Sequence, residues 1–123
     1  GGKSEWDTGA AVNNAVIMEF FDYGKMKYFD ETGIYVEKED ITIVIVHYEV
    51  DFMGQIFRND VPEVCTKVSK FGNKSLEVLQ HIICNGEVKA VCNTVMSGYN
   101  KRTKTSDVIP EYIKTSITKY ETN

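Results

Sequence analysis

The sequence contains little proline and little histidine, two residues of each in 123, and it has no long apolar run. None of its apolar runs approaches the roughly 18 residues that a membrane-spanning helix needs, so we expect no membrane span. The first residues lack the apolar core of a secretory signal peptide, and we expect none. Positive charge is also scarce, since 14 Lys and Arg against 18 Asp and Glu give a formal net charge of −4. Because phosphate binding needs a basic surface, nucleic acid is not expected as the main partner.

Cysteine is sparse as well, and its three copies carry no metal-binding pattern. Cys65, Cys84 and Cys92 lie in apolar, strand-like runs, with no Cys-x-x-Cys pair and no Cys/His spacing typical of zinc sites. We therefore predict no metal site and no disulfide, but buried and reduced thiols in a cytoplasmic protein. His47 and His81 each stand alone in a strand-like run, so no catalytic triad is predicted.

The most apolar stretch of the chain predicts a helix over residues 14–32, ended by Gly33. Asn13 or Asn14 is the expected N-cap, because a short side-chain oxygen can accept a free first-turn N–H. At 100° per residue one face of the helix is apolar, and Gly24 near its middle predicts close approach to a sheet. The residues of that face are Ile17, Phe20, Phe21, Gly24 and Tyr28.

The opposite side of this helix is mainly charged, with Glu19, Asp22, Lys25, Lys27 and Asp30. We expect a solvated face with an Asp22–Lys25 ion pair, which contributes a few tenths of a kcal/mol, about 0.2–0.5. Met18, Met26 and Phe29 interrupt this polar side, so a partner subunit could cover it.

The rest of the chain has the pattern of strands separated by turn signals. Residues 41–46 form a continuous apolar, β-branched run, expected to be buried on both faces, and 47–52 continue it as a half-buried strand. Asn85-Gly86 is the strongest hairpin signal. Further strands are predicted at residues 64–70, 75–84 and 88–97, a short edge strand within 1–6, and a last amphipathic helix at 110–120. Together these elements predict one α+β domain over residues 1–123.

Residues 7–15, Asp-Thr-Gly-Ala-Ala-Val-Asn-Asn-Ala, followed by Phe20-Phe21-Asp22, resemble the hotdog-fold thioesterases of the 4-hydroxybenzoyl-CoA type. The pattern of that family is Asp-x-x-Gly-His-Val-Asn-Asn-Ala-x-Tyr, with Phe-Glu a few residues further on. Three later landmarks fall where the family has its equivalents, at residues 50–54, 72–76 and 109–111. The resemblance implies a hotdog fold, in which a curved antiparallel sheet wraps a long central helix and a short helix ends the chain.

The resemblance also implies hydrolysis of an acyl-CoA or acyl-carrier thioester without a metal or a cofactor. It gives Asp7 the place of the catalytic aspartate, and Asn14 the place whose backbone N–H polarises the thioester carbonyl. A carboxylate can attack a thioester or activate water, and the N–H groups of a helix N-terminus suit an oxyanion. Members of the family form dimers with a continuous sheet, and often tetramers, with active sites at the dimer interface. A homodimer or homotetramer is therefore expected.

The resemblance further indicates where acyl-CoA would bind. Residues 73–75 lie where the family often holds the pantetheine arm, and by composition alone they are equally typical of a hairpin turn. Arg102, between Lys101 and Lys104, suits the phosphates of CoA, and a solubilising loop would have the same composition. The expected substrate-binding residues are Asn13, Ile17, Asn73, Lys74, Ser75 and Arg102.

The chain departs from the family pattern in the motif itself. Ala10 and Ala11 replace the family's Gly and His, Ile17 replaces its Tyr, and Asp22 replaces its Glu. Subfamilies differ in whether the acid lies in the loop or on the helix, which keeps Glu19 and Asp22 as further candidates. Because Ala10, Ala11 and Ile17 stand in place of the family's residues, an alternative function is a non-catalytic hotdog module that binds acyl-CoA or serves only in oligomerisation. A hydratase of the same fold needs an Asp/His pair, which Ala11 leaves unsupported.

Overall fold

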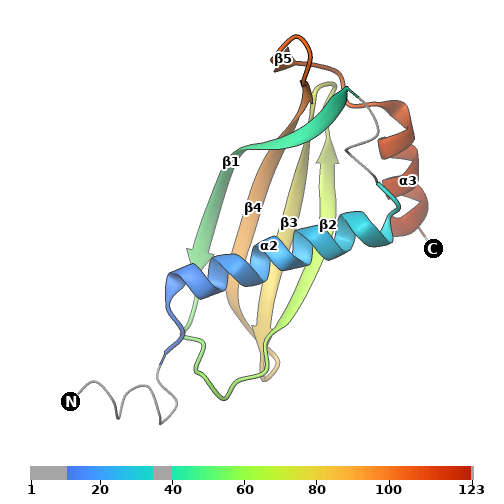
Figure 1. The fold of residues 1–123 in the computed structure, drawn as a ribbon. Helices are drawn as coiled ribbons and strands as arrows, with labels where there is room; N and C mark the ends of the chain where they lie inside the picture. The colour runs from blue at the N-terminus through green and yellow to red at the C-terminus, as the bar shows by residue number, and fades with distance from the viewer. Residues whose placement is uncertain (1–10, 35–39, 123) are drawn as a thin grey trace.

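The structure, a computed structural model, describes residues 11–34 and 40–122. The predicted short strand within residues 1–6 lies outside the described residues. The observed elements follow the predicted order of a long helix, antiparallel strands and a short helix (Figure 1). They are α2 (Asn14–Glu31), β1 (Ile41–Phe52), β2 (Glu63–Phe71), β3 (Ser75–Cys84), β4 (Glu87–Asn100), β5 (Thr105–Ser106) and α3 (Glu111–Glu121).

The strands form one antiparallel sheet in the order β1-β4-β3-β2, with the short β5 paired to β4. Helix α2 crosses one face of this curved sheet, and its main contacts are with β2 and β3 (Figure 1). The turn between β3 and β4 is the predicted Asn85-Gly86 hairpin, where both residues have positive φ, 54° and 77°. Positive φ at both central residues matches the twist of the flanking strands, so this pair sets the register of β3 on β4.

The ends of α2 follow from local chemistry, as predicted. Asn13 is the N-cap, and its side-chain oxygen accepts the backbone N–H of Val16 at 3.1 Å. Gly33 has a φ of 76°, a left-handed conformation that glycine adopts without steric cost, and it follows directly after the last turn. The predicted inner face is confirmed, because Ile17, Phe21 and Tyr28 are all buried.

Gly24 brings α2 against the sheet. A Cβ at this position would lie 2.7 Å from Cγ1 of Val64 and 2.9 Å from Nε2 of Gln80. Real Cβ atoms do not approach so closely, so any larger residue would push the helix away from β2 and β3. The predicted close approach is therefore confirmed.

The prediction that Lys25 is solvated is wrong. Lys25 is only 5% exposed, and its Nζ donates to Oε1 of Gln80 at 3.2 Å. Nε2 of Gln80 donates in turn to the carbonyl of Phe21 at 2.9 Å and to Oγ1 of Thr66 at 3.0 Å. The expected Asp22–Lys25 ion pair does form, at 3.5 Å. Because α2 lies so close to the sheet at Gly24, the next residue is enclosed as well, and a glutamine from β3 supplies the acceptor that a buried ammonium needs.

The polar residues Lys25, Gln80 and Thr94 divide the interior into two apolar clusters. Each of the three lies between members of the two clusters along its own element, on α2, β3 and β4. The upper cluster, toward β5 in Figure 1, contains Tyr28, Ile34, Ile43, Leu76, Val78, Met96, Ile109, Ile113 and Ile117. The lower cluster contains Ile17, Phe21, Ile56, Ile82, Cys84, Ala90 and Cys92. No buried side-chain nitrogen or oxygen lacks a hydrogen-bond partner in the described part of the chain.

The prediction that residues 41–46 are buried on both faces is also wrong. Only Ile43 of this run is buried, whereas Ile45 and, further along β1, Tyr48 are 44% and 47% exposed. The physical reason is position: β1 is an outer strand of the described sheet, and α2 covers β2 and β3 instead. A register shift between Ile45 and His47 marks a β-bulge at Val46, which adds twist to this outer strand.

We expect Gly24→Ala to destabilise the protein by about 1 kcal/mol. Overpacking typically costs about 1–3 kcal/mol, more than the roughly 1 kcal/mol that alanine gains over glycine in a helix. Urea denaturation compares this variant with wild type, and Lys27→Ala on the exposed side of α2 serves as the control. A more stable Gly24→Ala protein would contradict the close approach.

We expect Gln80→Leu to destabilise the protein by about 2–4 kcal/mol, because it leaves the Lys25 ammonium buried without its main acceptor. Adding Lys25→Met should restore part of this loss, since the double variant has no buried charge to satisfy. Urea denaturation of the two single variants and the double variant gives the coupling free energy. Lys27→Met, an exposed lysine on the same helix, should change little. Strictly additive losses would show that the two side chains do not depend on each other.

Candidate functional site

The N-terminus of α2 presents backbone N–H groups to solvent. The Asn13 side chain accepts the N–H of Val16, and the Asn13 carbonyl accepts the N–H of Ile17 at 3.2 Å. Within the described residues, the N–H groups of Asn14 and Ala15 have no hydrogen-bond partner, and both residues are exposed. Two adjacent donors therefore remain open at the positive end of the helix dipole.

The segment before the helix is held by the connection between β1 and β2. Ala11 forms an isolated antiparallel bridge with Phe57, and the N–H of Val12 donates to the carbonyl of Ile56 at 2.6 Å. The N–H of Phe57 donates to Oδ2 of Asp60 at 2.8 Å. These bonds fix the direction in which the chain enters α2, and with it the direction of the open N–H groups.

A cavity of about 280 Å³ lies at this helix end, lined by Ala11, Val12, Asn13, Val16 and Arg58. Nothing in the sequence marks Arg58, which is one cation in a polar break between two strands. Only the pairing of Ala11 with Phe57 brings it beside the helix N-terminus. Positive charge at Arg58 and the positive end of the helix dipole lie on the same side of the molecule, which favours a ligand that carries or develops negative charge next to this cavity.

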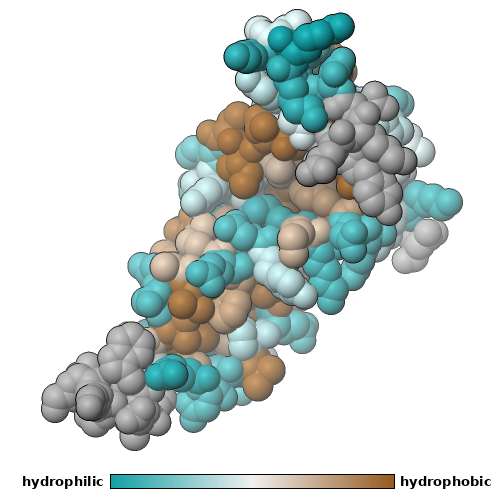
Figure 2. Space-filling view, viewed as in Figure 1, coloured by the Kyte–Doolittle hydropathy of each residue, from teal (hydrophilic) through white to brown (hydrophobic). Residues whose placement is uncertain are grey.

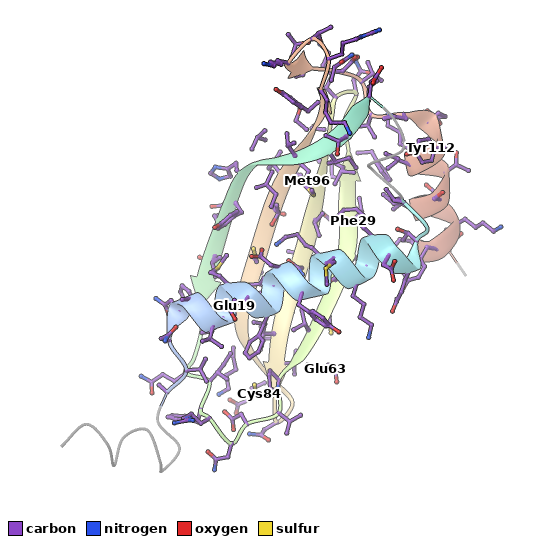
Figure 3. The ribbon with its side chains drawn as sticks, in the orientation of Figure 1. Glu19, Phe29, Glu63, Cys84, Met96 and Tyr112 are labelled. Atoms are coloured by element: carbon purple, nitrogen blue, oxygen red, sulfur yellow. The ribbon has the colours of Figure 1, made fainter. Side chains whose placement is uncertain are left out.

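None of the acidic candidates is among the described residues that line this cavity. Asp7 lies outside the described residues, so its role stays a prediction. Glu19 and Asp22 lie on α2 and are exposed, and neither lines the cavity. Asp22 pairs with Lys25, as described above. Figure 3 shows Glu19 on α2.

Ile17 and Asn13 have clear structural roles besides their predicted contact with substrate. Ile17 is 3% exposed and belongs to the lower cluster. The side-chain oxygen of Asn13 caps the helix, while the residue as a whole lines the cavity. Contact of either residue with substrate stays a prediction.

The other predicted substrate contacts lie at the far end of the sheet. Asn73, Lys74 and Ser75 form the turn into β3, where the Lys74 carbonyl accepts the N–H of Gly98 at 2.8 Å. The length of the ten-residue β3, roughly 30 Å at about 3.4 Å per residue, separates this turn from the lower cluster and the N-terminus of α2. One chain therefore does not bring these residues together with Asn14.

Arg102 lies at the same far end. Its backbone N–H donates to Oδ1 of Asn100 at 2.9 Å, and the residue lines an open cavity of about 570 Å³ together with Asp107 and Glu111. Hydrogen bonds from the Val108 N–H and from the Asn100 side chain lower the pKa of the Asp107 carboxyl. Acids thus share this cavity with Arg102, so a phosphate there would meet both signs of charge.

Metal and cysteine chemistry find no support in the described residues. No three His, Cys, Asp or Glu side chains of that part of the chain cluster closely enough to hold a metal ion. All three cysteines are free; Cys84 and Cys92 are buried as predicted, whereas Cys65 is only half-buried. Partial burial and the neighbouring Glu63 raise the pKa of the Cys65 thiol, which favours the unreactive protonated form.

Comparison with protein families identifies the family of this chain. The model of the thioesterase-like superfamily matches residues 2–117, nearly the whole chain. The chain belongs to the thioesterase-like superfamily. No protein of curated function matches it in sequence. In the described residues, no helix is long and apolar enough to cross a membrane.

Solved structures with the same arrangement include thioesterases. A thioesterase from Thermus thermophilus complexed with coenzyme A and Zn shares 25% identity over 94% of this chain and 84% of its own, with a TM-score of 0.79. A predicted thioesterase from Bacillus stearothermophilus shares 25% identity over 89% and 82%, with a TM-score of 0.78. A Staphylococcus aureus protein in complex with CoA shares 19% identity over 92% and 74%, with a TM-score of 0.81, a likeness of fold alone.

These findings confirm the predicted α+β hotdog fold and the predicted resemblance to thioesterases. They also confirm the general class of activity, the hydrolysis of a thioester.

We expect Asn13→Ala to destabilise the protein by about 1 kcal/mol, because it removes the side-chain acceptor at the start of α2. Asn13→Ser should retain most of the stability, since a hydroxyl can accept the same N–H. Thermal unfolding measures both variants. Equal melting temperatures for wild type and Asn13→Ala would mean that the cap does not stabilise the helix.

Proposed function

We propose that this chain hydrolyses an acyl-CoA thioester at the N-terminus of α2. The observation that carries the proposal is the pair of open N–H groups, Asn14 and Ala15, beside a cavity that Arg58 also lines. In this proposal the thioester carbonyl oxygen accepts from the Asn14 N–H. The donor then becomes stronger as negative charge develops on that oxygen, and one such donor typically contributes about 3 kcal/mol of transition-state stabilisation.

Asp7 is proposed as the acid–base group of the reaction. As a general base, it takes a proton from water while the water oxygen bonds to the carbonyl carbon. The tetrahedral intermediate then breaks its carbon–sulfur bond, and CoA leaves as a thiolate that takes up a proton. The alternative route, direct attack by the Asp7 carboxylate, passes through an acid anhydride that water hydrolyses. Both routes consume one water and yield a free acid and a thiol.

We further propose that the working form is a homodimer joined along β1, alone or within a tetramer. Strand β1 is long, forms an outer edge of the described sheet, and exposes Ile45 and Tyr48. Two copies of β1 paired antiparallel about a two-fold axis would extend the sheet and set opposite ends of the chains side by side. The 73–75 turn and Arg102 of one copy would then approach the helix N-terminus of the other. This arrangement accounts for predicted substrate contacts that one chain keeps about 30 Å apart.

The three free cysteines favour a reducing compartment, and we propose the cytoplasm. The alternative function, a non-catalytic module that binds acyl-CoA or only oligomerises, rests on Ala10, Ala11 and Ile17 in place of the family's residues. Turnover separates the two functions directly.

We expect Asp7→Asn to lower kcat for acyl-CoA hydrolysis by about 10²–10⁴-fold while the melting temperature stays close to that of wild type. A thiol-release assay over a panel of aliphatic and aromatic acyl-CoA substrates measures the loss. Glu87→Gln makes the same carboxylate-to-amide change on the exposed β3–β4 hairpin and should leave turnover unchanged. Ligand-dependent thermal stabilisation without turnover by the wild-type protein would favour the non-catalytic module.

A further inference from the structure

A second cavity lies between the C-terminal half of α2 and the upper part of the sheet. Its volume is about 310 Å³, and it is lined by Met26, Phe29, Asp30, Ile34, Ile43 and Met96. In Figure 3, Phe29 of α2 and Met96 of β4 lie near one another between the helix and the upper part of β1. None of these residues takes part in the proposed chemistry at the helix N-terminus.

The lining of this cavity selects for a neutral, apolar ligand. Ile34, Ile43 and Met96 are buried and form its floor, whereas Met26 is 62% exposed and lies at its mouth. Two methionines let the walls adapt to a flexible hydrocarbon. Among the described lining residues Asp30 alone is ionisable, and it would repel a ligand that carries a carboxylate at this end.

An apolar surface leads from this cavity toward the N-terminus of α2. The register of β1 on β4 sets Ile45 opposite Met96 and Tyr48 opposite Thr94. Residues directly opposite in an antiparallel pair point to the same face, so the exposed side chains of Ile45 and Tyr48 lie on the side of the sheet that α2 covers. Figure 2 shows hydrophobic surface over the upper part of β1, close to the helix. Phe52, opposite Ala90, continues this surface to the lower end of β1.

The distance along the helix sets a minimum length for a ligand that occupies both ends. Asn14 and Met26 are twelve residues apart on α2, which corresponds to about 18 Å at 1.5 Å per residue. Each carbon–carbon bond of about 1.5 Å advances an extended chain by less than its own length. An acyl group that starts at Asn14 therefore needs at least about a dozen carbons to reach the cavity.

We propose that this cavity holds the far end of a long, neutral acyl chain whose thioester carbonyl is bound at Asn14. The inference rests on the proposed function and adds its substrate class: long-chain aliphatic acyl-CoA, in preference to short, aromatic or ω-carboxylated acyl groups. In this proposal the acyl chain runs from Asn14 along the apolar inner face of β1, past Tyr48 and Ile45, to the cavity.

Met26→Trp tests the proposal, because it fills the mouth of the cavity from an exposed position and leaves the buried floor intact. We expect kcat/KM for palmitoyl-CoA, below its micellar concentration, to fall by about 10–200-fold, the range for one altered apolar contact. The value for hexanoyl-CoA should stay within about twofold, because its chain is too short to reach Met26.

Tyr23→Trp is the matched control: Tyr23 is exposed on the same helix but does not line the cavity, and neither substrate should be affected. Equal losses for both substrates in Met26→Trp, or no loss, would overturn the assignment.

The outcome for the wild-type protein separates this inference from the proposed function. Hydrolysis of hexanoyl-CoA together with poor hydrolysis of palmitoyl-CoA would support the proposed thioesterase function and overturn the long-chain assignment. If no acyl-CoA is hydrolysed, the proposed function fails, and the cavity is then judged by binding alone. Displacement of the neutral dye Nile red by hexadecanol, lost in Met26→Trp but kept in Tyr23→Trp, would support an apolar chain site. Absence of displacement, as expected if a second copy of the chain fills the cavity, would overturn it.

Discussion

The contact of α2 with β2 and β3 at Gly24 is the constraint on which the rest of the structure depends. At this point the helix approaches so closely that a Cβ would collide with Val64 and Gln80. The same approach encloses Lys25, whose ammonium is then satisfied by Gln80. Gln80 also donates to the helix backbone at Phe21, so one side chain of β3 bonds two successive turns of α2. This contact sets the height, and through a directional hydrogen bond also the rotation, of the helix over the sheet.

Two functional features follow from that placement. Because α2 is fixed over β2 and β3, its N-terminus meets the β1–β2 connection, where Ala11 pairs with Phe57 and Arg58 lines a cavity together with the N-cap Asn13. For the same reason β1 is left without a helix above it. Its apolar inner face lies next to the cavity that Met26 and Met96 line. The proposed site of thioester hydrolysis thus lies at the N-terminus of α2, and the apolar cavity lies beside its C-terminal half.

The polar residues Lys25, Gln80 and Thr94 give the interior an unusual division for a domain of this size. A buried ammonium contributes little net stability, because the desolvation penalty offsets most of the gain from its partners. Its value lies in specificity: a helix shifted along its axis or rotated by one residue would leave the charge and the carboxamide unsatisfied. The two apolar clusters supply the hydrophobic free energy, and the polar residues between them determine how the layers align.

Local patterns in the chain are sufficient for the two helices, the four long strands, the Asn85-Gly86 hairpin and the likeness to hotdog thioesterases, because propensity, periodicity and motif spacing act over a few residues. They narrow the helix cap to Asn13 or Asn14 and miss the short β5. Periodicity also identifies Gly24 as the point of close approach, and the family likeness points to Asn14 as a donor at the helix N-terminus. They do not reveal that Lys25 is buried, that β1 is an exposed edge, or that Arg58 reaches the helix N-terminus. Each of these depends on which strand lies beneath the helix and which strand ends the sheet. Burial and strand order arise from contacts between residues far apart in the chain, and only the tertiary structure decides them.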